Sequence, residues 1–146
     1  MQMTAFLAVA AAAAAAPAPV EHFPAAARDG TPRPFSEAVR VGDMLYLSGQ
    51  IGIAPDGTLP DGIEAQTRQM MENIGATLVR AGAGWGDVVH CLVMLEDMAE
   101  WAQFNRIYVP YFPAGRLPAR SAFGADGLAL GARVEMECKA RLAPAR

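Results

Sequence analysis

The residues of this chain best suited to chemistry are an arginine that follows a proline, a serine-glycine pair and a glutamate. Pro118-Ala119-Arg120-Ser121 holds a planar fork of donors on backbone stiffened by the proline ring. Such a fork binds a carboxylate or phosphate through two parallel hydrogen bonds. Ser48-Gly49 ends an apolar segment, and Glu135 lies on the polar side of a later one. We expect all three groups on the open side of a sheet, holding a small acid and a water.

Each of these residues also has an ordinary structural interpretation. An arginine beside a proline is usually a surface residue with a solvated or loosely paired charge. Glu135 could pair with Arg133 or Lys139 along the strand surface, and Ser48 could be a hydroxyl beside a turn. The residue types alone therefore leave a site and a solvated surface both open.

The elements that position these residues are predicted from turn residues and hydrophobic spacing. Gly42-Asp43 separates two short apolar segments, 39–41 and 44–48, which predicts a β-hairpin. A helix follows, with Asp61 and Glu64 as a capping box at its start and Gly82 at its C-terminal cap. Its apolar face recurs at helical spacing. That face consists of Ile63, Thr67, Met70, Ile74 and Leu78.

The second half of the chain repeats this pattern of strand and helix. Val88 to Leu95 is an apolar run of strand length. Asp97 and Glu100 predict the start of a second helix, which Pro110 should end early because it lacks a backbone donor. The aromatic residues of this helix are expected in the core rather than around a ligand. They are Trp101, Phe104, Tyr108 and Tyr111.

The last two segments are predicted strands, 119–125 and 133–142, and the second of them alternates apolar and charged residues. The order is therefore strand, strand, helix, strand, helix, strand, strand. This order predicts one α+β domain in which two helices cover one face of a mixed, mostly antiparallel sheet.

Composition narrows the possible functions. The chain of 146 residues suits one domain, and its net charge of −3 argues against a broad nucleic-acid surface. His22 and His90 have no matching acidic or cysteine cluster, so we expect no metal site. Cys91 and Cys138 lie in strand-like segments, where buried free thiols are the default. The alternative is a disulfide, which can form only if the protein is exported and the two cysteines lie side by side.

Residues 1–19 do not read as part of the fold. Phe6 to Val9 and the alanines up to Ala16 are typical of a secretory signal peptide, although no Lys or Arg precedes them. The run is too short for a stable transmembrane helix. Export, with a bacterial periplasm as the destination, is the first interpretation. A disordered alanine-rich leader on a cytoplasmic protein is the alternative. Residues 20–33 form an N-terminal extension before a domain at 34–143.

Seven short motifs follow one another between about Pro32 and Leu142. They are Pro34-Phe35-Ser36-Glu37-Ala38, Ser48-Gly49-Gln50-Ile51, Gln66-Thr67-Arg68-Gln69 with Glu72-Asn73-Ile74, Asp87-Val88-Val89, Phe104-Asn105 with Tyr108, Pro118-Ala119-Arg120-Ser121 and Val134-Glu135-Met136-Glu137. In order and spacing they closely resemble the RidA (YjgF-like) reactive-intermediate deaminases. The resemblance covers nearly all of the expected fold.

This resemblance implies a chorismate-mutase-like fold, a homotrimer with clefts between subunits, and no metal or organic cofactor. It also implies hydrolysis of 2-imino acids and their enamine tautomers to 2-keto acids and ammonia. By resemblance, Arg120 grips the substrate carboxylate and Glu135 positions or activates the attacking water. Ser48-Gly49 lines the cleft, Asn105 lies near it, and the backbone carbonyl of Ala122 faces the departing nitrogen.

Two positions depart from the pattern of the family. Phe35 stands where the family often has tyrosine, so a hydroxyl that can contact water or substrate is lost. Ala122 replaces a frequent cysteine, which keeps the backbone role only. Phe35 favours a second hypothesis, a trimer that binds small carboxylates without efficient catalysis. A third, RNA cleavage, is ascribed to some relatives, and the acidic balance and the lack of a histidine pair argue against it.

Overall fold

The computed structural model describes residues 16–27 and 30–143. Within them, seven strands form one sheet and two α-helices pack against it. The strands are β1 Val20–Pro24, β2 Ser36–Val41, β3 Met44–Leu47, β4 Gln50–Ile51, β5 Val88–Leu95, β6 Ala119–Gly124 and β7 Val134–Arg141. The helices are α1 Ile63–Arg80 and α2 Trp101–Tyr108.

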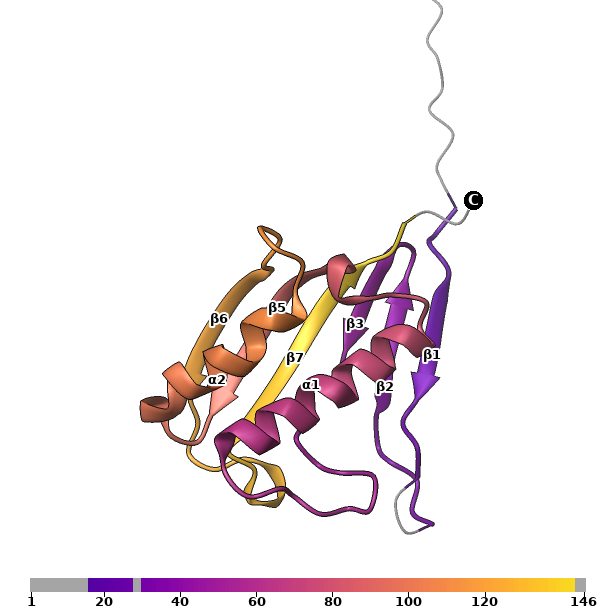
Figure 1. The fold of residues 1–146 in the computed structure, drawn as a ribbon. Helices are drawn as coiled ribbons and strands as arrows, with labels where there is room; N and C mark the ends of the chain where they lie inside the picture. The colour runs from indigo at the N-terminus through magenta and orange to yellow at the C-terminus, as the bar shows by residue number, and fades with distance from the viewer. Residues whose placement is uncertain (1–15, 28–29, 144–146) are drawn as a thin grey trace, which may run out of the picture.

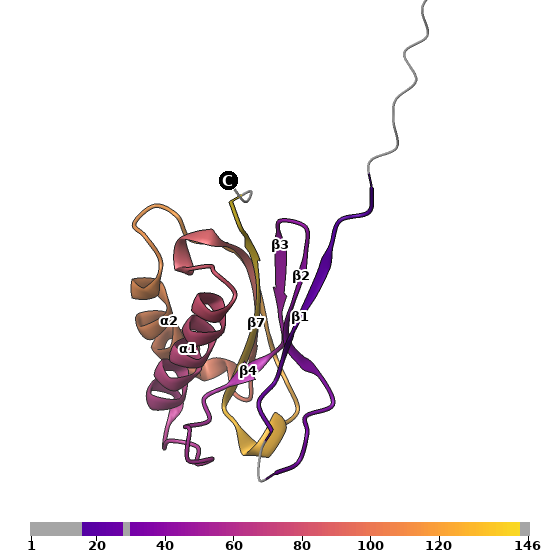
Figure 2. The ribbon, with the colours of Figure 1, turned by 90° about the vertical axis from the view of Figure 1, so that its right-hand side faces the viewer.

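The sheet has the order β1-β2-β3-β7-β5-β6 (Figure 1). The short β4, labelled in Figure 2, pairs with β7. Only β5 and β6 run parallel; every other pairing is antiparallel. Both helices lie on one side of the sheet, which leaves its other side uncovered (Figure 2). The predicted α+β fold, with a mixed sheet and two helices on one face, is confirmed.

β1 is a strand that the sequence did not predict, in the segment read as an N-terminal extension. Its residues are mostly exposed and do not alternate clearly. What places it is backbone pairing with β2, from Val20 opposite Val41 to Pro24 opposite Ser36. β1 thus forms one edge of the sheet and β6 forms the other.

The hairpin and the end of α1 follow their predicted turn chemistry. Gly42 has φ of 60° between β2 and β3, a conformation that glycine adopts without a steric penalty. At the end of α1, Gly82 has φ of 77°, and the Ala83 N–H donates to the Leu78 carbonyl at 2.8 Å. This is the glycine-centred C-terminal cap that the sequence predicted.

The predicted capping box at the start of α1 is wrong. The residue that caps the helix is Gly62, and no side chain bonds to the first turn. Because α1 begins at Ile63, Asp61 lies one position too early for its carboxylate to reach the first free N–H groups. Glu64 instead pairs with Arg106 of α2 at 2.6 Å.

Of the two capping residues predicted for the second helical region, Asp97 is a cap and Glu100 is not. Asp97 caps the short 3₁₀ turn Met98–Glu100 by accepting from the Ala99 N–H at 2.8 Å. Glu100 is not a cap: it accepts from Nε of Arg133 at 3.0 and 3.1 Å. α2 ends at Tyr108, just before the 3₁₀ turn that contains Pro110, as the proline predicts.

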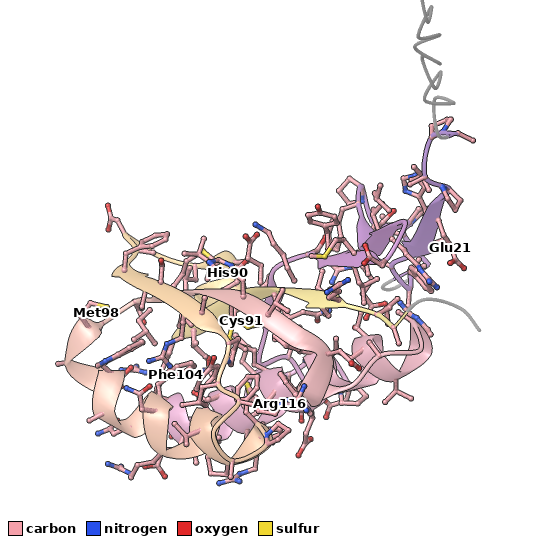
Figure 3. All side chains as sticks on the ribbon, turned by 90° about the horizontal axis from the view of Figure 1, so that it is seen from above. Glu21, His90, Cys91, Met98, Phe104 and Arg116 are labelled. Carbon is pink, nitrogen blue, oxygen red and sulfur yellow. A yellow bond between two sulfur atoms is a disulfide. The ribbon has the colours of Figure 1, made fainter. Side chains whose placement is uncertain are left out.

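The hydrophobic core lies between the sheet and the two helices. Its fully buried side chains include Leu45, Met70, Ile74, Val93, Phe104 and Met136. Cys91 of β5 and Cys138 of β7 are directly opposite each other, buried, and joined as a disulfide. The default prediction of two free thiols is therefore wrong, and the alternative of side-by-side cysteines is correct. Figure 3 shows Cys91 and Phe104 on the helix side of the sheet.

Two predictions concern the N-terminal region and the membrane. The predicted signal peptide falls largely on residues 1–15, which lie outside the described residues. Within 16–27 and 30–143, no helix has both the length and the apolar character needed to cross a membrane.

Candidate active site

Arg120 lies on the edge strand β6 and points toward α2. Its neighbour in the parallel register is Cys91, whose side chain is buried beneath the helices. Nη1 of Arg120 donates to Oδ1 of Asn105 at 2.8 Å. We expected Arg120 on the uncovered face, and that expectation is wrong, because the pairing of β6 with β5 turns this side chain to the helix side.

Two aromatic rings of α2 hold the Arg120 guanidinium. Its central carbon is 4.4 Å from the ring centre of Trp101 and 4.6 Å from that of Tyr108. A cation against aromatic faces is attracted by their quadrupoles and restricted in orientation. One fork nitrogen is used by Asn105. Most of the five N–H donors therefore remain for a ligand.

Tyr108 shows that this location is largely shielded from solvent. Burial raises the pKa of its hydroxyl, and the nearby Arg120 opposes that rise. The sequence assigned Trp101 and Tyr108 to the core and missed their contact with Arg120. A stripe of aromatic residues at helical spacing is usually core, so no signal in the sequence distinguishes this second role.

Glu135 lies on β7 and points to the uncovered face. It is opposite Met94 of β5 and Ile51 of β4, and alternates with the buried Val134 and Met136. Burial raises the pKa of the Glu135 carboxyl above its ordinary value, and the negative charge of Glu137 raises it further.

The structural interpretation of Glu135 as the partner of Arg133 is wrong. Arg133 forms its ion pair with Glu100. Lys139, the other proposed partner, forms no salt bridge among the described residues. Glu135 is therefore a partly buried carboxylate without a cationic partner in the described part of the chain.

Gly49 lies against Glu135, so close that it has no room for a side chain. A Cβ built on Gly49 would overlap Oε1 of Glu135 and lie 3.1 Å from its Cδ. The neighbouring Ser48 hydroxyl donates to the Ser36 carbonyl at 2.7 Å, so it ties the segment after β3 to the start of β2. The structure thus brings Gly49 to Glu135 and gives the Ser48 hydroxyl a partner within the fold.

We expect Gly49→Ala to lower kcat/KM by about 10-fold or more for a reaction in which Glu135 takes part, because the new methyl group displaces the Glu135 carboxylate. The fold should survive, since Gly49 is exposed and the obstructing atom is the end of a side chain. Steady-state kinetics together with circular dichroism measures both effects. Unchanged kinetics in a folded Gly49→Ala protein would remove Glu135 from the reaction.

Phe35 borders a hollow beside Glu135. Its side chain is 46% exposed, and the Arg33 guanidinium carbon lies 5.5 Å from the centre of its ring. The hollow has a volume of about 890 Å³ and is lined by Phe35, Gly49 and Leu130 among others. Gly49 connects the hollow to Glu135, since the Glu135 carboxylate lies against it.

The predicted site residues thus fall into two groups. Phe35, Gly49 and Glu135 form what we call the glutamate half-site, and Ser48 adjoins it. Asn105 and Arg120, with the rings of Trp101 and Tyr108, form the arginine half-site. Ala122 lies next to it on β6, half-buried on the helix side, opposite Val93. The sheet separates the two half-sites, so one chain cannot bring Arg120 and Glu135 to the same small ligand.

The fold and the half-sites define a class: a small α+β protein with an arginine held between aromatic rings and, across the sheet, a partly buried glutamate. The family described as Endoribonuclease L-PSP matches residues 25–142. The chain therefore belongs to this family, which includes the RidA (YjgF-like) proteins.

Similar proteins come from distant organisms. A mouse protein named 2-iminobutanoate/2-iminopropanoate deaminase is 39% identical over 113 residues, 76% of this chain and 83% of its own length. The chloroplastic Reactive Intermediate Deaminase A of Arabidopsis thaliana is 38% identical over 75% of this chain, a stretch that covers 59% of that longer protein. The crystal structure of RidA from an Antarctic Psychrobacter species superposes with a TM-score of 0.72 at 35% identity, covering 83% of this chain and 94% of that one.

Proposed function

We propose that this protein hydrolyses 2-imino acids and their enamine tautomers to 2-keto acids and ammonia. The observation that carries the proposal is the state of Arg120. Its guanidinium is oriented by two rings and by Asn105, yet it forms no ion pair with a carboxylate among the described residues. An oriented and unneutralised fork is suited to the carboxylate of a substrate. The name of the mouse relative supports the same reaction.

The reaction needs a water, a base and a held substrate. Water attacks C2 of the protonated C=N group, its oxygen bonds to that carbon, and Glu135 takes the released proton. The resulting amino alcohol passes a proton to nitrogen, the C–N bond breaks, and ammonia leaves behind a C=O group. Base assistance of this kind typically contributes about 10²–10⁴-fold. Imines hydrolyse readily in water, so this contribution and the positioning by Arg120 suffice.

The proposal includes assembly as a homotrimer in which the two half-sites meet between copies. Arg120 and Glu135 lie on opposite sides of the sheet, so a complete site needs a second chain. The uncovered face also exposes apolar side chains, with Tyr46 at 44% and Phe123 at 47%. Figure 2 shows that the helices leave this face uncovered. In this proposal a small molecule binds where half-sites of two chains meet, so binding depends on association of the chains.

The direct test generates imines in situ. An amino-acid oxidase supplies 2-imino acids from several amino acids, and their disappearance is followed with and without the protein. We expect faster loss with the protein than in buffer. No acceleration for any side-chain type would refute the deaminase proposal.

A second candidate function is binding of small carboxylates without efficient turnover. Phe35 favours it, because the ring at this position carries no hydroxyl to contact water or substrate. Calorimetry with a 2-keto acid separates the two functions. Binding of the keto acid together with uncatalysed imine loss would establish the second function and exclude the first.

The raised pKa of Glu135 predicts a pH dependence. A general base works when it is deprotonated, so activity should rise with pH through the pKa of Glu135, which lies above the ordinary carboxyl value. Glu137→Gln removes a neighbouring negative charge, which lowers that pKa and moves the acidic limb of the kcat profile to lower pH. Glu21→Gln, in the exposed β1, is the control and should leave the limb in place. A limb that stays in place in Glu137→Gln would contradict Glu135 as the base.

We also propose that the protein is exported. The Cys91–Cys138 disulfide supports this proposal, because disulfides persist in oxidising compartments and are rare in the cytosol. N-terminal sequencing of protein purified from its host is the test. A mature terminus at Met1 or Gln2 would rule out signal-peptide cleavage.

A further inference from the structure

We propose that the hollow beside the glutamate half-site selects 2-imino acids with bulky apolar side chains, and that Leu130 sets this preference. The inference rests on the proposed deaminase function and adds the substrate class.

Leu130 has an unusual conformation for its type. With φ of 58° and ψ of 21°, it is the one residue other than glycine with positive φ within 16–27 and 30–143. This region of backbone space is unfavourable for a branched side chain. The side chain is also 65% exposed, although it is large and apolar. Strained residues of this kind concentrate at ligand sites, so Leu130 is a candidate for substrate contact.

The hollow has both polar and apolar lining, and Leu130 belongs to its apolar part. Phe35 is 46% exposed there, and Ile51, Ile53 and Ala76 line the same space. The hollow is open to solvent and has a volume of about 890 Å³. A substrate side chain of one or two carbons would leave most of this apolar surface in contact with water. A larger apolar side chain would remove more of that surface from water.

Most polar groups that line the hollow already have partners within the protein. Glu37 pairs with Arg80 and accepts from the Thr77 hydroxyl. The Asn73 amide donates to the carbonyls of Ile51 and Ile53, at 3.0 and 2.9 Å. Satisfied groups of this kind gain little from a polar ligand. They make the hollow a poor match for substrates with polar side chains.

Two further charges line the hollow, and they have opposite signs. Asp56 accepts hydrogen bonds from the backbone and hydroxyl of Thr58. The guanidinium of Arg33 lies over the ring of Phe35. A charged substrate side chain would be attracted by one of these groups and repelled by the other, and an acidic one would also be repelled by Glu135. These two charges therefore do not make charged substrate side chains better ligands than apolar ones.

The test compares kcat/KM for imines derived from alanine, 2-aminobutyrate, leucine, phenylalanine and glutamate. We expect the leucine and phenylalanine imines to exceed the alanine imine by about 10-fold or more, since each added methylene in an apolar pocket can contribute about that factor. The glutamate imine should be the poorest substrate.

Leu130→Gly is the test variant, because glycine adopts a φ of 58° freely and the turn should keep its shape. It should lower kcat/KM for the leucine imine about 10-fold more than kcat/KM for the alanine imine. Leu117→Ala is the matched control. Leu117 is 56% exposed and is not among the residues that line the hollow.

The outcomes separate this inference from the proposed function. If no imine is consumed faster than in buffer, the deaminase function itself fails. If the alanine imine is hydrolysed without a preference for larger side chains, the function stands and the inference is overturned. An equal loss for all imines in Leu130→Gly would likewise overturn the role of Leu130 in selectivity.

Discussion

Replacing Arg120 with lysine is expected to lower kcat/KM for every 2-imino acid by roughly 100-fold. Lysine keeps the positive charge but cannot form two parallel hydrogen bonds to a carboxylate. Removal of a whole partner from a desolvated, hydrogen-bonded charge pair typically costs about 2–5 kcal/mol, and each 1.4 kcal/mol is a factor of ten. Because lysine keeps the charge and loses only the fork, the expected effect of roughly 100-fold lies in the lower part of this range. The contacts of the guanidinium with Trp101, Tyr108 and Asn105 would be lost as well.

The matched control for this variant is Arg116→Lys. Arg116 precedes the same strand and donates to the Gly86 carbonyl at 3.1 Å, outside both half-sites. It should keep the kinetics of the unsubstituted protein. Circular dichroism and size-exclusion chromatography should show that the Arg120 variant is folded and assembled. Full activity in Arg120→Lys would refute the carboxylate clamp.

Reduction of the Cys91–Cys138 disulfide is expected to lower the free energy of unfolding by about 4 kcal/mol. The two residues are 47 positions apart, and closing a loop of that length restricts the unfolded chain by about this amount in the chain-entropy account. Both side chains are buried in the core, so the reduced thiols can keep most of their packing.

Urea unfolding of the oxidised and reduced protein, at one protein concentration, measures the effect. The concentration must be fixed because association contributes to the stability of an oligomer. The double variant Cys91→Ala/Cys138→Ala should show the same midpoint with and without reductant. Equal midpoints for the oxidised and reduced natural protein would show that the cross-link contributes no stability.

Elements whose signals are local could be predicted from the sequence. The helical spacing of α1, the glycine turn at Gly42 and the alternation of β7 each depend on residues close together in the chain. β1 could not be predicted in the same way. Its placement depends on pairing with β2, and its own residues carry little pattern. The N-terminal cap of α1 is Gly62 and not the predicted Asp61, because the spacing of residue types does not fix a helix end to a single residue.

The candidate site was predicted less well than the fold. The alternation of β7 places Glu135 on the uncovered face, as expected, whereas the sequence does not determine the face of Arg120. Which side of β6 an arginine occupies depends on the register with β5, because a shift of one residue reverses every side chain. The contacts of Trp101 and Tyr108 with Arg120, and the Cys91–Cys138 pairing, also depend on register between distant strands.

Mixed trimers test whether Arg120 of one chain and Glu135 of another complete each site. Arg120→Ala and Glu135→Gln are each expected to be nearly inactive alone. When the two are co-expressed in equal amounts and purified together, random assortment places an intact Arg120 beside an intact Glu135 at about one site in four. We therefore expect recovery of roughly a quarter of the activity of the unsubstituted protein. Mixed trimers as inactive as either variant alone would contradict this expectation.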